Sequence, residues 1–244
     1  MTNKTIVILQ SNYIPWKGYF DLMAAADEFF LFDEVQFTKN DWRNRNRIVL
    51  NGKLHWLTLP IRTAGNFGAA IRDVEVANAS WAASHWQTIR QAYRGARHFK
   101  AVGEMFEQAY AATAPLMKLS VINQHFLRSV ASFLEIETRI LSADIVPRTT
   151  DDPTQRLLEI CRARGATAYV SGPAAHSYLD LAVFRAAGIA VHFVDYSGYP
   201  VYLQQCSPFE HGVSIIDALM HCGHDARWHL KALTQREQFL LPAG

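Results

Sequence analysis

The sequence predicts an α/β fold in which a mainly parallel sheet carries an added β-hairpin and a helical insertion. Short apolar runs at residues 6–9 and 29–32 each end in polar residues, which is typical of buried parallel strands. An Ala-rich helical segment at residues 19–27 lies between them. Strands and helices alternate again after residue 135. Together these patterns favour a Rossmann-like sheet.

The hairpin is indicated by two apolar runs, residues 48–50 and 54–59, that flank Asn51-Gly52. An Asn-Gly pair readily adopts the left-handed backbone that a two-residue hairpin turn requires. Residues 71–76 alternate apolar and polar side chains, which predicts a further, half-exposed strand.

The insertion is indicated by helical texture from Ser80 to about residue 134. We expect Ser80 to cap the first helix, in which Trp81, His85 and Ile89 share one face. The chain then divides into residues 1–79, the N-terminal part of the α/β core with the hairpin; 80–134, the helical insertion; and 135–244, the C-terminal part of the core with C-terminal helices.

The C-terminal part repeats the alternation. A proline near a helix start and glycines after helix ends mark the boundaries. The expected strands are residues 139–141, 167–170 and 189–194, and the expected helices are residues 153–164, 178–187 and 214–220.

Composition excludes several classes of protein. The 244 residues, half of them hydrophobic, suffice for a sizeable core, and a net charge of +2 does not indicate nucleic-acid binding. Cys161, Cys206 and Cys222 are widely spaced, which fits free thiols in a reducing compartment. The sequence shows no signal peptide and no apolar run near the roughly 18 residues that span a bilayer, so we expect a cytoplasmic protein without a membrane span. The histidines around Cys222 lack a partner cluster, and no metal site is predicted.

Polar residues follow three of the expected strands, at Gln10, Asp33 and Ser171. Because the carboxyl ends of parallel strands meet at one edge of an open sheet, we expect these groups to converge on a ligand site. Gly18 would let the backbone come close to the ligand. A competing interpretation is that the aromatic residues of this loop form a satellite core instead, namely Tyr13, Trp16, Tyr19 and Phe20.

A basic cluster follows the second strand. Lys39, Arg43, Arg45 and Arg47 lie within nine positions, with Trp42 among them. Arg45 and Arg47 are two residues apart, so in an extended chain their guanidinium groups share one face and suit a carboxylate or phosphate. Trp42 offers a flat surface for stacking. The alternative is a solvated, salt-bridged loop.

Several motifs resemble the WbqC-like family of bacterial proteins. They are ILQSNYIPWKGYFDLMAAADEFFLFDEVQFTKNDWRNRNRI, YVSGPAAHSYLD, the strand GIAVHFVDY and the helix FEHGVSIIDALMHCG. The likeness runs over nearly the whole chain. Members of the family are associated with the biosynthesis of sugars for surface polysaccharide and lipopolysaccharide, often alongside enzymes that make amino sugars. The resemblance therefore implies a pathway more firmly than a reaction.

The central motif departs from the family at one point, since Leu9-Gln10-Ser11 stands where the family usually has His-Gln-Pro. If that histidine is catalytic elsewhere, this chain either lacks the activity or uses another base. His85 is the substitute that the sequence offers, because the family also tends to carry a histidine in that helix. A histidine packed between Trp81 and Tyr93 is the competing interpretation.

The order of elements also resembles nucleotidyltransferases and ligases that bind ATP at a strand end and a helix N-terminus. Those enzymes carry a His-x-Gly-His signature, whereas this chain has Gly18-Tyr19 at the corresponding place. The likeness supports the fold more than the use of ATP.

Three functions remain open. The first is acyl or aminoacyl transfer to the amine of a nucleotide-linked amino sugar, from acyl-CoA or an acyl carrier protein thioester. The second is an ATP-dependent ligase or nucleotidyltransferase, and the third is a non-catalytic sugar-binding scaffold. A cysteine nucleophile at Cys206 or Cys222 is weaker, since neither has an activating context.

For the transferase, His85 or Asp33 is the candidate base, Gln10 and Asn12 are candidate donors, and Arg45, Arg47 and Lys39 are candidates for phosphate. For the ATP-dependent enzyme, Ser171-Gly172 and the Gly18 loop would cradle the phosphates. The catalytic candidates are Gln10, Asp33 and His85. The substrate-binding candidates are Asn12, Tyr13, Trp16, Gly18, Tyr19, Gln36, Lys39, Trp42, Asn44, Arg45, Arg47, Ser171, Gly172 and Tyr178.

Overall fold

The main sheet contains six strands in the part of the chain that the computed structural model describes, residues 3–62 and 68–243. Their order is β5-β2-β1-β6-β7-β8, and neighbours pair in parallel except β8, which is antiparallel to β7. This confirms the predicted Rossmann-like sheet, and the strand order reverses between β1 and β6. The strands are β1 (Thr5–Leu9), β2 (Glu28–Leu31), β5 (Arg139–Ser142), β6 (Ala168–Ser171), β7 (Ala190–Val194) and β8 (Leu240–Pro242).

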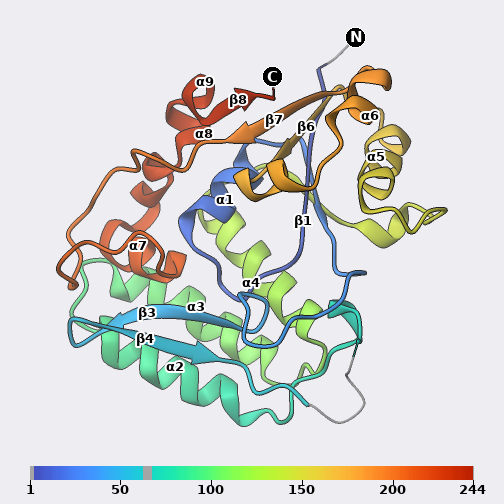
Figure 1. Cartoon of the computed structure of the whole chain (residues 1–244). Helices are drawn as coiled ribbons and strands as arrows, with labels where there is room; N and C mark the ends of the chain where they lie inside the picture. Colours follow the sequence, from blue (N-terminus) through green and yellow to red (C-terminus); the bar gives the residue numbers. More distant parts are fainter. Residues whose placement is uncertain (1–2, 63–67, 244) are drawn as a thin grey trace.

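The predicted hairpin is confirmed as a separate antiparallel sheet of β3 (Arg45–Leu50) and β4 (Lys53–Thr58). Asn51 and Gly52 have φ values of 51° and 73°, the left-handed backbone of a tight turn. In Figure 1 the hairpin lies below the main sheet and runs along α2, while α5 and α6 lie beside β6 and β7. The helices are α1 (Lys17–Ala24), α2 (Ser80–Tyr93), α3 (Phe99–Thr113), α4 (Leu119–Phe133), α5 (Pro153–Ala163), α6 (Leu181–Ala186), α7 (Ile215–Cys222), α8 (Lys231–Thr234) and α9 (Arg236–Phe239).

Both faces of the sheet are buried, because successive residues of β1 point into two different clusters. Val7 packs into the larger cluster with residues of α1 to α4 and α7. Ile6 and Ile8 pack into the smaller cluster with Leu158 of α5 and Phe184 of α6. The carboxyl end of β1, from which the site is built, is therefore held from both sides. No helix among the described residues is both long and apolar enough to cross a membrane.

Three local predictions are wrong. Residues Ile71–Asp73 form a 3₁₀ helix instead of a strand. The N–H of Ile71 donates to the carbonyl of Val35, and among the described residues Glu75 and Val76 each form only an isolated β-bridge, so no continuous strand pairing develops. Ser80 is the first residue of α2, and its N–H donates to the side chain of Asn78. The helix predicted at 178–187 begins at Leu181, because Pro173–Ser177 form a 3₁₀ helix first.

The C-terminal segment is fastened to the first helix by a buried carboxylate. Asp21 of α1 is fully buried and accepts hydrogen bonds from the N–H groups of Lys231 and Ala232, at the start of α8. It also accepts one from the hydroxyl of Tyr199, at 2.6 Å. Burial raises the pKa of Asp21 above its ordinary value, and these hydrogen bonds oppose that rise.

Candidate functional site

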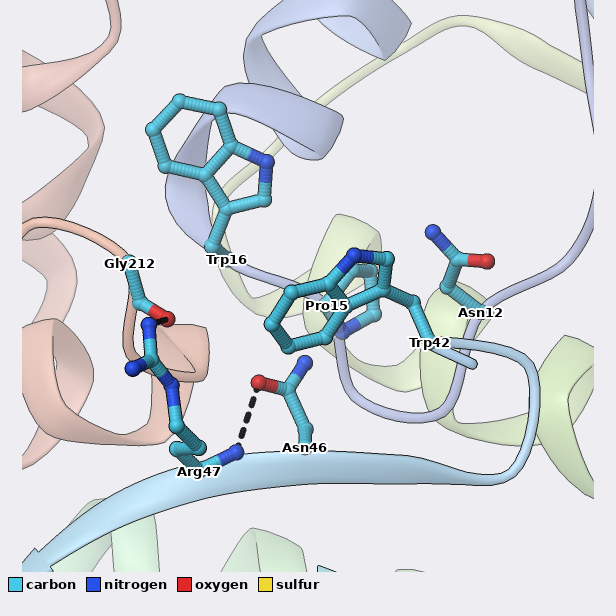
Figure 2. A pocket seen from close by; sticks show the side chains of 7 residues that line it. All are labelled: Asn12, Pro15, Trp16, Trp42, Asn46, Arg47 and Gly212. Carbon is cyan, nitrogen blue, oxygen red and sulfur yellow. Dashed lines mark hydrogen bonds between the residues drawn. The ribbon is translucent and has the colours of Figure 1, made fainter. Parts of the chain in front are cut away.

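A pocket of about 300 Å³ lies between the loop after β1 and the outer face of the hairpin. Figure 2 shows the indole rings of Trp16 and Trp42 above the guanidinium group of Arg47. We call it the indole pocket; its lining residues are Asn12, Pro15, Trp16, Trp42, Asn46, Arg47 and Gly212. The sequence predicted Asn12, Trp16, Trp42 and Arg47 as ligand-binding residues, and the structure brings these four together.

The loop after β1 has a strained backbone that the hairpin supports. Ile14 has a φ of 38°, a left-handed conformation that a β-branched side chain rarely adopts. The side-chain amide of Asn46 donates to the carbonyl groups of Tyr13, at 3.2 Å, and Ile14, at 2.9 Å. Its Oδ1 accepts from the N–H of Arg47 at 2.8 Å. Asn46 therefore couples the shape of the loop to the strand that carries the pocket's cation.

Trp16 takes the space that the sequence assigned to a ligand at Gly18. A Cβ atom at Gly18 would lie 2.3 Å from Cζ2 of Trp16, so only glycine lets the indole fold back over α1. The ring also packs edge-on against Tyr196 and Tyr199, with centroid distances of 4.9 Å and 5.8 Å. The close approach at Gly18 is thus made by the protein's own side chain, which fixes one wall of the pocket.

Arg47 is held at the opposite wall. Its Nη2 donates to the carbonyl of Gly212 at 3.1 Å and lies 3.8 Å from a carboxylate oxygen of Glu210. The backbone carbonyl of Arg47 accepts from the N–H of Ser214 at 2.8 Å. These contacts tie the hairpin to the segment before α7, and the guanidinium points toward Gly212 at one side of the pocket (Figure 2).

A second arginine reaches the β1 loop. Arg43 Nη1 donates to Asn12 Oδ1 at 2.7 Å, and its Nη2 donates to Gln10 Oε1 at 3.4 Å. Gln10, which follows β1, therefore binds the guanidinium of Arg43 and does not line the pocket itself. Sequence reasoning placed Arg43 in the basic cluster but did not name Arg43 or Asn46 as candidate site residues, although Asn46 stands in the Asn-Arg-Asn-Arg motif and Arg43 precedes it.

Arg45 has a different role from the one predicted. It shares a face of β3 with Arg47, as the spacing indicated, but its Cζ lies 4.2 Å from the ring centroid of Trp56. This is a cation–π contact on an exposed surface. The pair does not grip a single anion, because one guanidinium covers an indole and the other faces Gly212.

The predicted bases Asp33 and His85 lie behind the β1 loop. Asp33 accepts from the N–H of Ser11 at 2.8 Å and from the hydroxyl of Ser120, so its carboxylate orients the loop. His85 Nδ1 is 2.8 Å from the hydroxyl of Tyr13. Burial is the main cause that lowers the pKa of His85 to about 4. Neither residue lines the pocket, and the interpretation of His85 as a packed core histidine fits its position.

Tyr13 and Tyr19 belong to the core, which corrects their prediction as substrate-binding residues. Tyr13 is fully buried, and its hydroxyl also contacts that of Tyr110 at 2.7 Å. The Tyr19 side chain is 2% exposed, and its hydroxyl donates to the carbonyl of Gln10 at 2.9 Å. The satellite-core interpretation therefore holds for these two and for Phe20, but not for Trp16.

The other predicted residues lie outside the indole pocket. Gln36, Lys39 and Asn44 line a separate hollow of about 660 Å³ with residues 58–62. Ser171 ends β6 and Gly172 follows it, at the same sheet edge as Gln10, as the parallel pairing requires, but neither lines the pocket. Tyr178 is 61% exposed.

Lys17, beside Trp16, is a buried cation that sequence reasoning missed. It is 3% exposed, and its Nζ lies 3.0 Å from His211 Nδ1 and 5.0 Å from the ring centroid of Tyr199. The rings of Tyr202 and Phe209 are at 5.5 Å and 5.4 Å. Burial lowers the pKa of Lys17 to about 8, and the charge of Asp217 opposes that change.

The chemistry of the pocket is that of a binding site for a ring with an anionic group. Two indoles offer apolar surface, the Asn12 amide offers hydrogen bonds and Arg47 offers a positive charge, while both donors of the Asn46 amide are taken by the carbonyls of Tyr13 and Ile14. Burial raises the pKa of Cys222 to about 11, which is the reverse of nucleophile activation. Among the described residues, no three His, Cys, Asp or Glu side chains are grouped so that they could hold a metal ion.

Comparison with known proteins agrees with the motifs. The chain is 40% identical over 232 residues to the uncharacterized protein Rv1507c of Mycobacterium tuberculosis (strain ATCC 25618 / H37Rv), a match that covers 95% of this chain and 100% of that protein. No solved structure matches the chain. The family model of the WbqC-like protein family matches residues 10–229 of the chain. The predicted resemblance is thereby confirmed, and the chain belongs to the WbqC-like protein family.

Proposed function

We propose that this protein is a transferase of surface-polysaccharide sugar biosynthesis that binds a nucleotide-linked amino sugar in the indole pocket. The observation that carries the proposal is that Arg47 lines the same pocket as two indoles and the Asn12 amide, with its Nη2 held by Gly212. Indoles pack on the apolar faces of sugar rings, amides bind hydroxyls, and a guanidinium binds phosphate bidentately. Arg43 adds a second positive charge 2.7 Å from Asn12.

The reaction that fits such a ligand is transfer of an acyl group to its amine. The nitrogen attacks the carbonyl carbon of a thioester, a C–N bond forms and the C–S bond breaks. The departing thiolate takes the proton that the nitrogen releases. An acyl-CoA or an acyl carrier protein is the donor class that this chemistry requires.

A sugar-binding role without turnover is the second candidate. The burial of His85 and the engagement of Asp33 by Ser11 and Ser120 favour it, because neither predicted base reaches the pocket. The ATP-dependent alternative loses support at α1. Trp16 folds over Gly18 there, whereas a phosphate at a helix N-terminus needs open N–H groups.

The binding step is tested by calorimetric titration of the protein with UDP-glucosamine. Loss of a hydrogen bond to a charged group costs about 1.5–3 kcal/mol, so Arg47→Met is expected to weaken binding by about 10- to 150-fold. Arg97→Met, which changes an exposed arginine after α2, is the matched control and should leave the affinity unchanged. Equal affinities of the wild-type protein and the Arg47 variant would contradict the proposal.

Turnover is tested separately with UDP-glucosamine and acyl-CoA thioesters. Release of free thiol, together with a nucleotide sugar heavier by one acyl group, supports the transferase. Binding of UDP-glucosamine without either product, across acyl-CoA and acyl carrier donors, would leave the sugar-binding role in its place.

A further inference from the structure

The outer face of the hairpin continues the indole pocket as an exposed aromatic platform. Arg47 and Trp56 are direct partners in the β3–β4 register, so their side chains share this face. Trp42, from the turn before β3, lies beside Trp56, with ring centroids 5.6 Å apart and planes inclined by 32°. We call Trp42 and Trp56 the indole pair.

The indole pair remains open to solvent. Trp42 is 41% exposed and Trp56 is 42% exposed, so two of the largest apolar side chains face water next to each other. Adjacent exposed aromatic rings on a rigid element mark a binding surface, whereas scattered apolar residues do not. The platform also carries positive charge. Arg45 lies over Trp56, and Cζ of Arg47 is 5.9 Å and 5.7 Å from the Trp42 and Trp56 centroids.

The size of the pocket shows why a ligand would extend onto this platform. Its volume of about 300 Å³ is at the lower end for small-molecule sites, enough for one ring with its substituents. Trp42 and Arg47 line both the pocket and the platform. A ligand whose sugar occupies the pocket and whose phosphate meets Arg47 must therefore carry its next group outward, across the indole pair.

We propose that the indole pair is a nucleoside subsite, on which the base of a nucleotide-linked sugar stacks while its phosphates lie beside Arg47. The inference rests on the proposed function, since it places the sugar in the indole pocket. The two centroids are too close for a base to slide between the rings, which needs about 7 Å at ~3.5 Å for each contact. The base therefore stacks on the outward side of the pair, where it takes the place of the Arg45 guanidinium that lies 4.2 Å from the Trp56 centroid. Stacking alone recognises the planar base and does not select its identity.

The experiment compares three probes by calorimetric titration: UDP-glucosamine, UMP and glucosamine 1-phosphate. The variants are Trp56→Ala and, as a matched control, Trp228→Ala, which removes an indole that is 55% exposed after α7. Removal of one stacking ring is expected to weaken UDP-glucosamine and UMP by about 5- to 100-fold. Glucosamine 1-phosphate should bind Trp56→Ala as tightly as it binds the wild-type protein, and Trp228→Ala should bind all three probes normally.

The outcomes separate the subsite from the function on which it rests. If wild-type protein binds glucosamine 1-phosphate and UDP-glucosamine equally well, and Trp56→Ala changes neither affinity, the subsite is refuted and the proposed function stands. Equal weakening of all three probes by Trp56→Ala would also refute the subsite, because the change would then act on the pocket as a whole. If the wild-type protein binds neither sugar-containing probe, the proposed function fails and the subsite fails with it.

Discussion

Replacement of Lys17 by methionine tests how much a buried charge beside the pocket costs the folded protein. The side chain is 3% exposed, and burial lowers its pKa from 10.5 to about 8. A difference of one pKa unit corresponds to about 1.4 kcal/mol, so the charged form of Lys17 destabilises the fold by roughly 3 kcal/mol. A methionine keeps the unbranched, apolar stem of the side chain and removes the charge and the cation–π contacts of Nζ.

The sign of the effect follows from proton binding. Below pH 8 both the folded and the unfolded chain hold the proton, and the full cost is present. Between pH 8 and 10.5 the unfolded chain still holds it while the folded protein releases it, so stability rises with pH. Above 10.5 the cost is gone. The Lys17→Met protein lacks this proton, and its stability relative to wild type therefore falls as pH rises.

The assay is urea unfolding of both proteins at several pH values from 7 to 9.5. Across that range the difference in unfolding free energy, variant minus wild type, is expected to fall by about 2 kcal/mol. The buried tyrosines titrate in both proteins, so their contribution cancels in the difference. A difference that stays constant from pH 7 to pH 9.5 would refute the view that Lys17 is charged and desolvated in the folded state.

Two further predictions concern the pocket wall at Gly212 and the buried ion pair between Arg156 and Glu34. A Cβ atom at Gly212 would lie 2.8 Å from Nη2 of Arg47, so Gly212→Ala should weaken UDP-glucosamine binding severalfold in calorimetry with little change in stability. Gly95→Ala is the control, since nothing lies within 4 Å of the new atom, and equal affinities of both variants would contradict the steric argument. Arg156 is 1% exposed and donates to both carboxylate oxygens of Glu34, at 2.7 Å and 3.1 Å. Because Glu159 still pairs with Arg156 at 3.2 Å, Glu34→Gln should lower the urea-unfolding free energy by about 1.5–3 kcal/mol, and a loss below 1 kcal/mol would show that the pair is not desolvated.

The fold was predictable where the signal is local. Asn51 and Gly52 adopt the left-handed backbone of a tight turn by themselves. The short apolar runs of β1 and β2 are typical of strands that are buried on both faces, whatever residues cover them. The 3₁₀ helix at Ile71–Asp73 was not predictable, because its alternating pattern also suits a strand. Whether a strand forms there depends on partners that lie far away in the chain.

The pocket was predictable in its residue types but not in its contacts. Trp42 and Arg47 stood out as a flat ring and a cation close together. The contacts that set their geometry join distant positions: Asn46 holds Ile14 across 32 residues, and Arg47 is held by Gly212 across 165. The sequence does not distinguish the fully buried Tyr13 from the exposed Trp42, because the burial of an aromatic residue is decided by contacts with distant parts of the chain.

The carboxylate of Asp21 links the first helix, α1, to α8 near the C-terminal end, so this contact can form only late in biosynthesis. Its backbone partners in α8 lie 210 and 211 positions further along the chain. At about 5–20 residues per second, a ribosome takes roughly 10–40 s to make that stretch. Throughout that time the nascent N-terminal half lacks the groups that satisfy Asp21. A ribosome-bound chain that stops before Lys231 should therefore be cut rapidly by protease near α1, and one extended past β8 with a linker should resist.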